Sequence, residues 1–206
     1  PPRSTLFPYT TLFRSGLMAA EGRTDQLAPH VRQSATMVLR LCVGYVVFGV
    51  LALWIAGMNL FDAINHAFSA LATGGFSTRP ESIAYWNNPL VEIVIMVLCL
   101  IGAINFYIAY TFLQRKYGAV WRSGEIRLML LSLVVTTTLI VAFTTLPLYE
   151  GNVLQAVRVA LFEAVSSMTS TGFTITTYTG WSDFGVLMLI LLMLVGGGTC
   201  STAGGI

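Results

Sequence analysis

The chain has 206 residues, of which 55% are hydrophobic and only 10% are charged, so it has too little polar surface to cover a soluble globule. Its 11 Lys and Arg residues against 9 Asp and Glu residues give a net charge of +2, which excludes the strongly basic surface of a nucleic-acid-binding protein. We therefore expect an all-α integral membrane protein with the lipid bilayer, and no nucleic acid, as its surroundings.

The N-terminal residues differ from the apolar segments that follow them. Residues 5–15 resemble the in-frame translation of a sequencing adaptor, so we expect residues 1–16 to be an artefact and leave them out of the fold argument. Residues 17–37 are then expected to form a cytoplasmic flank. The end of the chain at Ile206, inside a glycine-rich run, agrees with a gene fragment.

A first group of segments occupies residues 38–126. Residues 38–57 and 89–113 are apolar and long enough to cross a hydrocarbon core of about 30 Å as helices. Between them lie a semi-apolar stretch at 60–72 and a Thr, Gly and Ser segment at 73–77. Because the first span leaves the membrane and the second re-enters it, the stretch between them is predicted to be a re-entrant helix. A helix lying in the membrane interface is the alternative.

A second group, residues 127–206, follows the same order. It contains a span at 127–147, a semi-apolar helix at 153–169 and a polar loop at 170–174. The apolar helix predicted over 182–195 is too short to cross the membrane before glycines interrupt it at 196–205. A break at that depth must be held by protein or line a water-filled cavity.

The charges orient these segments. Basic residues gather before the first span and between the two groups, and they are scarce in the connections 58–89 and 147–183, which hold Arg79 and Arg158. The positive-inside rule therefore places the following residues in the cytoplasm: Arg23, Arg32, Arg40, Arg115, Lys116, Arg122 and Arg127.

The two groups are an internal repeat. A shift of 97 residues, from 66 to 163, brings residues 66–77 onto 163–174, with Ala67/Ala164, Ser69/Ser166, Gly75/Gly172 and Phe76/Phe173 coinciding. Two copies of span, short helix, glycine loop and span are typical of a pore-loop channel, whose loops present backbone carbonyls to a cation.

The residue types suit that role. We expect Gly74, Gly75 and Gly172 to permit the backbone angles that aim carbonyls at one axis, and the short helices to point their partially negative C-terminal ends at the cation. Phe76 and Phe173 are expected to wedge the loops against neighbouring helices. The loop hydroxyls either add oxygen ligands or bind the loop's own amides; they belong to Thr73, Ser77, Ser170, Thr171 and Thr174.

Three motifs carry a family resemblance: TGGFSTRPESI at 73–83, STGFTITTY at 170–178 and VGGGTCSTAGGI at 195–206. Together they resemble the membrane subunit of the Trk/Ktr/HKT superfamily of potassium transporters. The resemblance implies four span, pore-helix, filter-loop, span repeats around one pore, of which this chain carries the second and most of the third. It also implies that the K+ selectivity filter receives Thr73, Gly74, Gly75, Ser170, Thr171 and Gly172.

The same resemblance implies a gate. The run 196–205 would be an intramembrane loop that lies under the filter and obstructs the path when closed, and a tight helix-packing patch of small residues is the alternative. The gating residues would be Gly196, Gly197, Gly198, Thr199, Ser201, Thr202, Gly204 and Gly205.

By the same resemblance, the protein is no enzyme, binds no cofactor and takes up K+ as its transported ion. Its partners would be a second copy, forming a homodimer, and a cytosolic nucleotide-binding regulatory subunit of the TrkA or KtrA type. Its location would be the bacterial plasma (inner) membrane, as a multi-pass protein.

Two other functions are weighed. A sodium-permeable or weakly selective channel of the same fold stays open, because two of four filter loops lie outside this sequence. An intramembrane serine protease using Ser201 or Ser77 is disfavoured, because only His30 and His66 are present, no GxSxG motif occurs and the repeat would have no explanation.

Several other polar residues are given structural roles. His66 lies four residues after Asp62, which predicts a contact on one helix face, with an ion-sensing or proton-handling role as the alternative. Glu163 is predicted to pair with Arg158, with cation attraction as the alternative, and Glu92 to reach the membrane interface. We expect buried reduced thiols at Cys42, Cys99 and Cys200.

Overall fold

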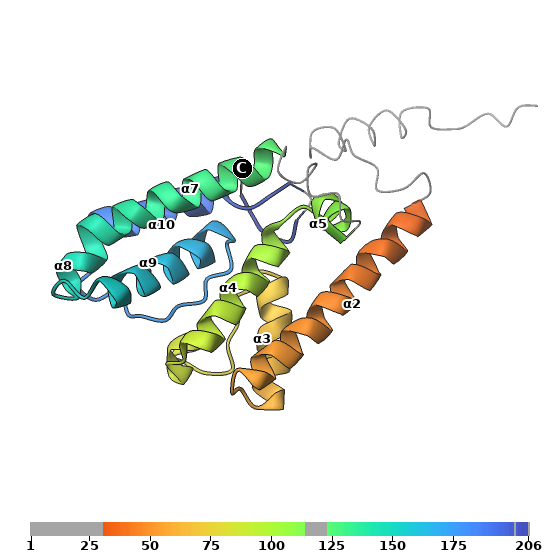
Figure 1. Ribbon diagram of the computed structural model, residues 1–206, viewed down its shortest axis with the longest axis horizontal. Helices are drawn as coiled ribbons and strands as arrows, with labels where there is room; N and C mark the ends of the chain where they lie inside the picture. Colours follow the sequence, from red (N-terminus) through yellow and green to blue (C-terminus); the bar gives the residue numbers. More distant parts are fainter. Residues whose placement is uncertain (1–30, 114–122, 200, 206) are drawn as a thin grey trace, which may run out of the picture.

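The computed structural model describes residues 31–113, 123–199 and 201–205. The expected artefact, most of the predicted flank, the basic residues between 114 and 122, and Cys200 lie outside these residues. Within the described ranges every regular element is a helix, as Figure 1 shows.

The first unit consists of three helices. α2 (Val31–Ile55) stops before Gly57, whose φ of 109° turns the chain. α3 (Leu60–Leu71) begins at Asn59, whose side chain accepts a hydrogen bond from the Asp62 amide. After a short 3-10 turn, η1 (Ser82–Trp86), α4 (Pro89–Ala103) begins with a proline in its first turn. A helix is therefore present where the re-entrant segment 60–72 was predicted.

The structure divides the helix predicted over 89–113. α4 ends at Ala103, and a separate helix, α5 (Phe106–Leu113), follows after Ile104 and Asn105. The reason lies in the C-terminal chain. The amides of Gly198 and Thr202 donate to the carbonyls of Ala103 (2.8 Å) and Gly102 (3.0 Å), which a continuous helix would have used internally.

The second unit repeats the arrangement with changes at its turns. α7 (Gly124–Ile140) runs into a π turn, η2 (Val141–Thr145), and a short α8 (Leu146–Leu148). α9 (Val153–Met168) is N-capped by Asn152, and α10 (Asp183–Val195) is N-capped by Ser182. α10 ends at Gly196, which has a φ of 70°.

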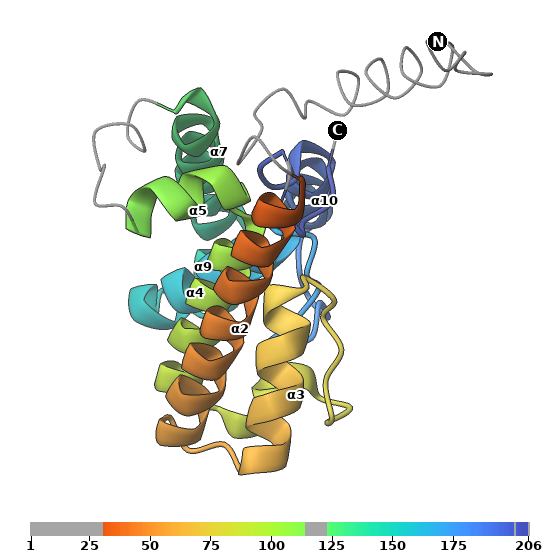
Figure 2. The same ribbon diagram turned by 90° about the vertical axis from the view of Figure 1, so that its right-hand side faces the viewer.

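The two units lie side by side. In Figure 1, α2, α3 and α4 form one group, and α7, α9 and α10 form the other, with α10 behind α7. Figure 2 shows α3 running beside α2. α4 packs against α9, so the last long helix of one unit touches the short helix of the next. Buried Leu98, Phe162 and Phe173 belong to the core at this junction.

Among the residues that the structure describes, two helices are long and apolar enough to cross a membrane, Ala35–Ile55 and Gly124–Leu148. The apolar helices α4 and α10 are shorter. Large apolar side chains stay exposed along these elements, for example Val47 at 54% and Val134 at 61%, which is the distribution expected of a lipid-facing surface.

Candidate functional site

The two glycine loops have the same backbone conformation. We call residues 73–77 loop A and residues 170–174 loop B. The residues before them, Ala72 and Thr169, have the same φ of −80° and ψ of 1°. The next residue is left-handed in both, with φ of 49° at Thr73 and 54° at Ser170. The shift of 97 residues found in the sequence is therefore also the structural register.

The glycines contribute differently from what the sequence predicted. Gly75 (φ 67°) and Gly172 (φ 85°) are left-handed, as a glycine-dependent turn requires. Gly74 is not left-handed, whereas Thr73 and Ser170 are. The left-handed threonine and serine were missed because only glycine is normally read as a signal for that conformation.

Several backbone carbonyl groups of the two loops accept no hydrogen bond. In the part of the chain that the structure describes, none of the hydrogen bonds ends on a carbonyl of 73–75 or 170–172. Those of Phe173 and Thr174, by contrast, accept from Ser166 Oγ (2.6 Å) and the Ile83 amide (3.1 Å). The backbone oxygens of the six candidate filter residues are thus free of hydrogen bonds within the described residues, as are those of Phe76 and Ser77 in loop A.

The loops touch each other. A Cβ added to Gly75 would overlap the carbonyl oxygen of Thr171. Phe173 is buried and stacks on the His66 ring with 5.8 Å between centroids, whereas Phe76 is 81% exposed. The wedge predicted for both phenylalanines is therefore present only in loop B. Gly172 has open space where a side chain would point.

His66 contacts Asp62, but through the backbone. Its Nδ1 lies 2.7 Å from the Asp62 carbonyl oxygen, and its Nε2 lies 2.9 Å from Ser77 Oγ. The Asp62 carboxylate instead accepts hydrogen bonds from Asn59, Thr78 and Arg79. The four-residue spacing therefore predicted correctly that His66 and Asp62 are neighbours. The Asp62 carboxylate, however, is bound by Thr78 and Arg79 of the segment that follows α3.

The predicted pair of Glu163 and Arg158 does not form. Five residues apart, they lie about 140° around α9 from each other and face different neighbours. Glu163 accepts from Thr174, Ile175 and Tyr178, and Arg158 binds Glu92 on α4. Glu92 is only 2% exposed, so the expectation that it reaches the interface was wrong; a cation from the next unit neutralises it.

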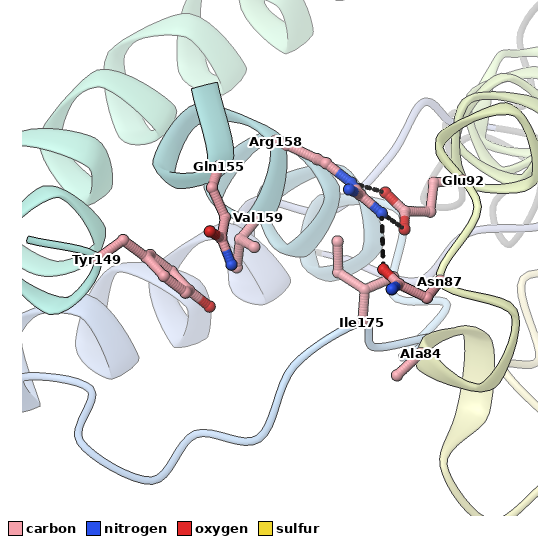
Figure 3. A pocket seen from close by; sticks show the side chains of 8 residues that line it. All are labelled: Ala84, Asn87, Glu92, Tyr149, Gln155, Arg158, Val159 and Ile175. Carbon is pink, nitrogen blue, oxygen red and sulfur yellow. Dashed lines mark hydrogen bonds and ion pairs between the residues drawn. The ribbon is translucent and has the colours of Figure 1, made fainter. Parts of the chain in front are cut away.

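This ion pair lies at the edge of a small cavity whose volume is about 90 Å³. Figure 3 shows the side chains that line it. Arg158 Nε and Nη2 lie 2.6 and 2.5 Å from the two carboxylate oxygens of Glu92, and Nη2 also donates to Asn87 Oδ1 at 3.4 Å. The Arg158 side chain is a third exposed, and the Glu92 side chain is almost fully buried. The pair therefore links the two units next to the loops.

Removing the Arg158 side chain should destabilise the protein by about 2 kcal/mol, because it leaves the Glu92 carboxylate buried without a counter-charge. The thermal midpoint of Arg158→Met in detergent should fall by several degrees, and adding Glu92→Gln should recover most of the loss. An unchanged midpoint for Arg158→Met would show that the pair contributes nothing to the contact between the units.

The C-terminal glycine run forms a closed turn, which we call the C-terminal loop (residues 196–205). The Gly197 amide donates to the Gly204 carbonyl at 3.0 Å, and a Cβ on Gly196 would overlap that same carbonyl. Ser201 Oγ donates to the Gly198 carbonyl at 2.6 Å. These close backbone approaches explain why the run consists of glycine and small polar residues.

Thr202 joins this loop to the first unit. Its Oγ1 lies 2.8 Å from the carbonyls of both Leu71 and Gly102, at the ends of α3 and α4. Its own carbonyl accepts from Thr73 Oγ1 at 2.7 Å. The C-terminal loop is thereby bonded directly to the first residue of loop A, and Gly204 lies near Ser170 of loop B.

Glu125, which the sequence reading did not single out, is the other anchor. It lies in the first turn of α7, and its carboxylate accepts from the backbone amide and the hydroxyl of Thr199. An acidic residue opening a helix normally suggests interaction with the helix dipole, so the sequence held no signal for this distant partner.

The chemistry of the site is that of oxygen ligands. The described residues contain no group of three or more His, Cys, Asp or Glu side chains that could hold a metal ion. Loops A and B instead place unbonded carbonyls just after the C-terminal ends of α3 and α9, while the hydroxyls of Thr73, Thr171 and Thr174 are already hydrogen-bonded within the protein. Such a set matches a weakly bound monovalent cation better than a tightly held divalent one.

Two short helices in register, each followed by a glycine loop and set between apolar helices, define an all-α integral membrane protein built from repeated units. The chain belongs to the TrkH family: the family model described as "Cation transport protein" matches residues 10–206. That match includes residues 10–16, which lie within the segment expected to be an artefact. The proteins it resembles are transporters rather than enzymes.

Three relatives illustrate the match. The chain is 32% identical over 188 residues to the Trk system potassium uptake protein TrkH of Escherichia coli strain K12, covering 89% of this chain and 38% of that protein. It is 32% identical over 191 residues to TrkG of the same strain. The crystal structure of the potassium transporter TrkH from Vibrio parahaemolyticus superposes with a TM-score of 0.80 and 29% identity, covering 93% of this chain and 41% of that one. These matches confirm the predicted family and fold class, and the chain spans about two fifths of the relatives' length.

Proposed function

We propose that this chain contributes two of the filter loops, and the gate beneath them, to a transporter that takes up K+ across a bacterial inner membrane. The observation that carries the proposal is the set of free carbonyls on two loops of matched conformation that touch each other. Carbonyl oxygens replace the water shell of a K+ ion, and the membrane potential supplies about 2.3 kcal/mol per charge per 100 mV.

The proposed filter residues are Thr73, Gly74, Gly75, Ser170, Thr171 and Gly172. The proposed gate is the C-terminal loop, which is supported by its hydrogen bonds to Thr73, to the ends of α3 and α4, and to Glu125. A gate that closes the path must contact the filter loops. Single hydrogen bonds of this kind are weak enough to break and re-form when the gate opens and closes.

The relatives are named as parts of a Trk system, which supports a partnership with a cytosolic nucleotide-binding regulatory subunit and a homodimeric membrane subunit. The Ser77 to His66 contact gives no support to a protease, because Asp62 offers His66 a carbonyl rather than a carboxylate and the second unit has Thr174 and Glu163 in the same places.

Growth on limiting K+ tests the proposal. The full-length gene that contains this segment, expressed in a bacterium lacking its own K+ uptake systems, should restore growth at low K+. Restored flux of Na+ but not K+ would replace the proposal with the sodium-permeable alternative, and no flux of either ion in well-expressed protein would overturn both.

A further inference from the structure

We infer that Glu163 is a positioning residue that sets the ion preference of loop B by holding the segment behind it. The inference rests on the proposed function and extends it to a side chain that contacts no ion. Glu163 lies on α9, has no exposed surface and is seven residues before the first residue of loop B.

The Glu163 carboxylate binds the chain immediately after the proposed ligands. Its Oε1 accepts from Thr174 Oγ1 at 2.8 Å and from the Ile175 amide at 2.9 Å, and its Oε2 accepts from the Tyr178 hydroxyl at 2.6 Å. Both oxygens are therefore occupied by donors of one short segment. Burial, followed by the charge of Glu163, raises the pKa of Tyr178, so the phenol remains a donor at neutral pH.

The same connection occurs in the first unit with different chemistry. His66 is the residue in register with Glu163, and its Nε2 contacts Ser77 Oγ, the residue in register with Thr174, at 2.9 Å. In both units a fully buried side chain of the short helix thus binds the hydroxyl eleven residues later. Because two different residue pairs occupy the equivalent place in the two units, the connection between short helix and loop matters more than the identity of the two residues that make it.

This connection acts on the direction of the free carbonyls. Ser166 Oγ holds the Phe173 carbonyl and Glu163 holds Thr174, so α9 fixes two consecutive residues directly after Gly172. Because Phe173 and Thr174 are fixed by these hydrogen bonds, the carbonyls of residues 170–172 keep one direction and one spacing. A cation whose bare radius differs from that spacing loses ligand contact, which is how a fixed loop discriminates between K+ and Na+.

The experiment compares ion preference in variants of the full-length transporter, measured as the ratio of K+ to Na+ flux in proteoliposomes. Thr174→Val and Glu163→Gln should each lower the ratio by about threefold to tenfold, the effect of one or two net hydrogen bonds. Thr174→Ser keeps the hydroxyl and should retain the wild-type ratio. Thr177→Val makes the same change at an exposed neighbour whose hydroxyl binds nothing in the described residues, and it is the matched control.

A double-variant cycle separates positioning from general damage. If the two residues act through one bond, Glu163→Gln combined with Thr174→Val should lower the ratio no further than the larger single change. Tyr178→Phe, which leaves Oε1 and its two donors intact, supplies a milder variant should Glu163→Gln assemble poorly.

Ratios equal to wild type in Thr174→Val and Glu163→Gln, in a protein that carries K+, would overturn this inference and leave the proposed function standing. Equal losses in Thr174→Val and Thr177→Val would also overturn it. A wild-type protein that carries no K+ would instead overturn the proposed function, and this inference with it.

Discussion

Gly75→Ala is expected to abolish K+ transport in the full-length protein, lowering flux by more than about a hundredfold. A Cβ at Gly75 would occupy the position of the Thr171 carbonyl oxygen, and the residue's φ of 67° already disfavours any side chain. Because the obstacle is backbone of the other loop, no rotamer change can relieve it. K+ or Rb+ uptake into cells that express equal amounts of assembled protein measures the effect.

Two other glycines are the controls for this prediction. Gly172→Ala has the same backbone strain, with a φ of 85°, but open space for the methyl group, so it should lower flux by only about tenfold. Gly44→Ala lies in α2 with nothing near its Cβ position and should leave uptake unchanged. Equal losses for Gly75→Ala and Gly172→Ala would mean that backbone strain, and not contact between the loops, limits transport.

Thr202→Val should raise K+ flux in the absence of the regulatory subunit by about fivefold to tenfold. The hydroxyl shares its one proton between the carbonyls of Leu71 and Gly102, and losing that interaction weakens the attachment of the C-terminal loop by about 1 kcal/mol. The shape of the side chain is kept, so packing is little changed. Flux and dimer yield should be measured on the same preparation.

The control for this second prediction is Thr138→Val, an exposed position whose hydroxyl bonds only within its own helix, and it should leave flux unchanged. If the C-terminal loop is a packing patch and not a gate, Thr202→Val would lower dimer yield and flux together. A well-assembled Thr202→Val protein with wild-type, still-regulated flux would contradict the gate.

The sequence indicated most of the loop architecture because the repeat reports on local structure. Residues matched by the shift of 97 have matched backbone angles, as at Gly75 and Gly172, since a short helix followed by a tight turn is set by its own residues. The three motifs also identified the family. The left-handed Thr73 and Ser170 were not predicted, because glycine is the residue normally expected in that conformation.

By itself, then, the sequence determined the helical segments, the repeat and the positions of the three loops, because hydrophobic length and glycine placement act over a few residues. Only the tertiary structure decided which partner each buried polar group takes. Glu92 pairs with Arg158, which lies 66 residues further along the chain. Glu163 binds Thr174 at the end of loop B. α4 ends where amides of the C-terminal loop donate hydrogen bonds to its last carbonyls. Such partners depend on how each helix is rotated and packed against distant elements, and composition and spacing along one segment do not specify that rotation.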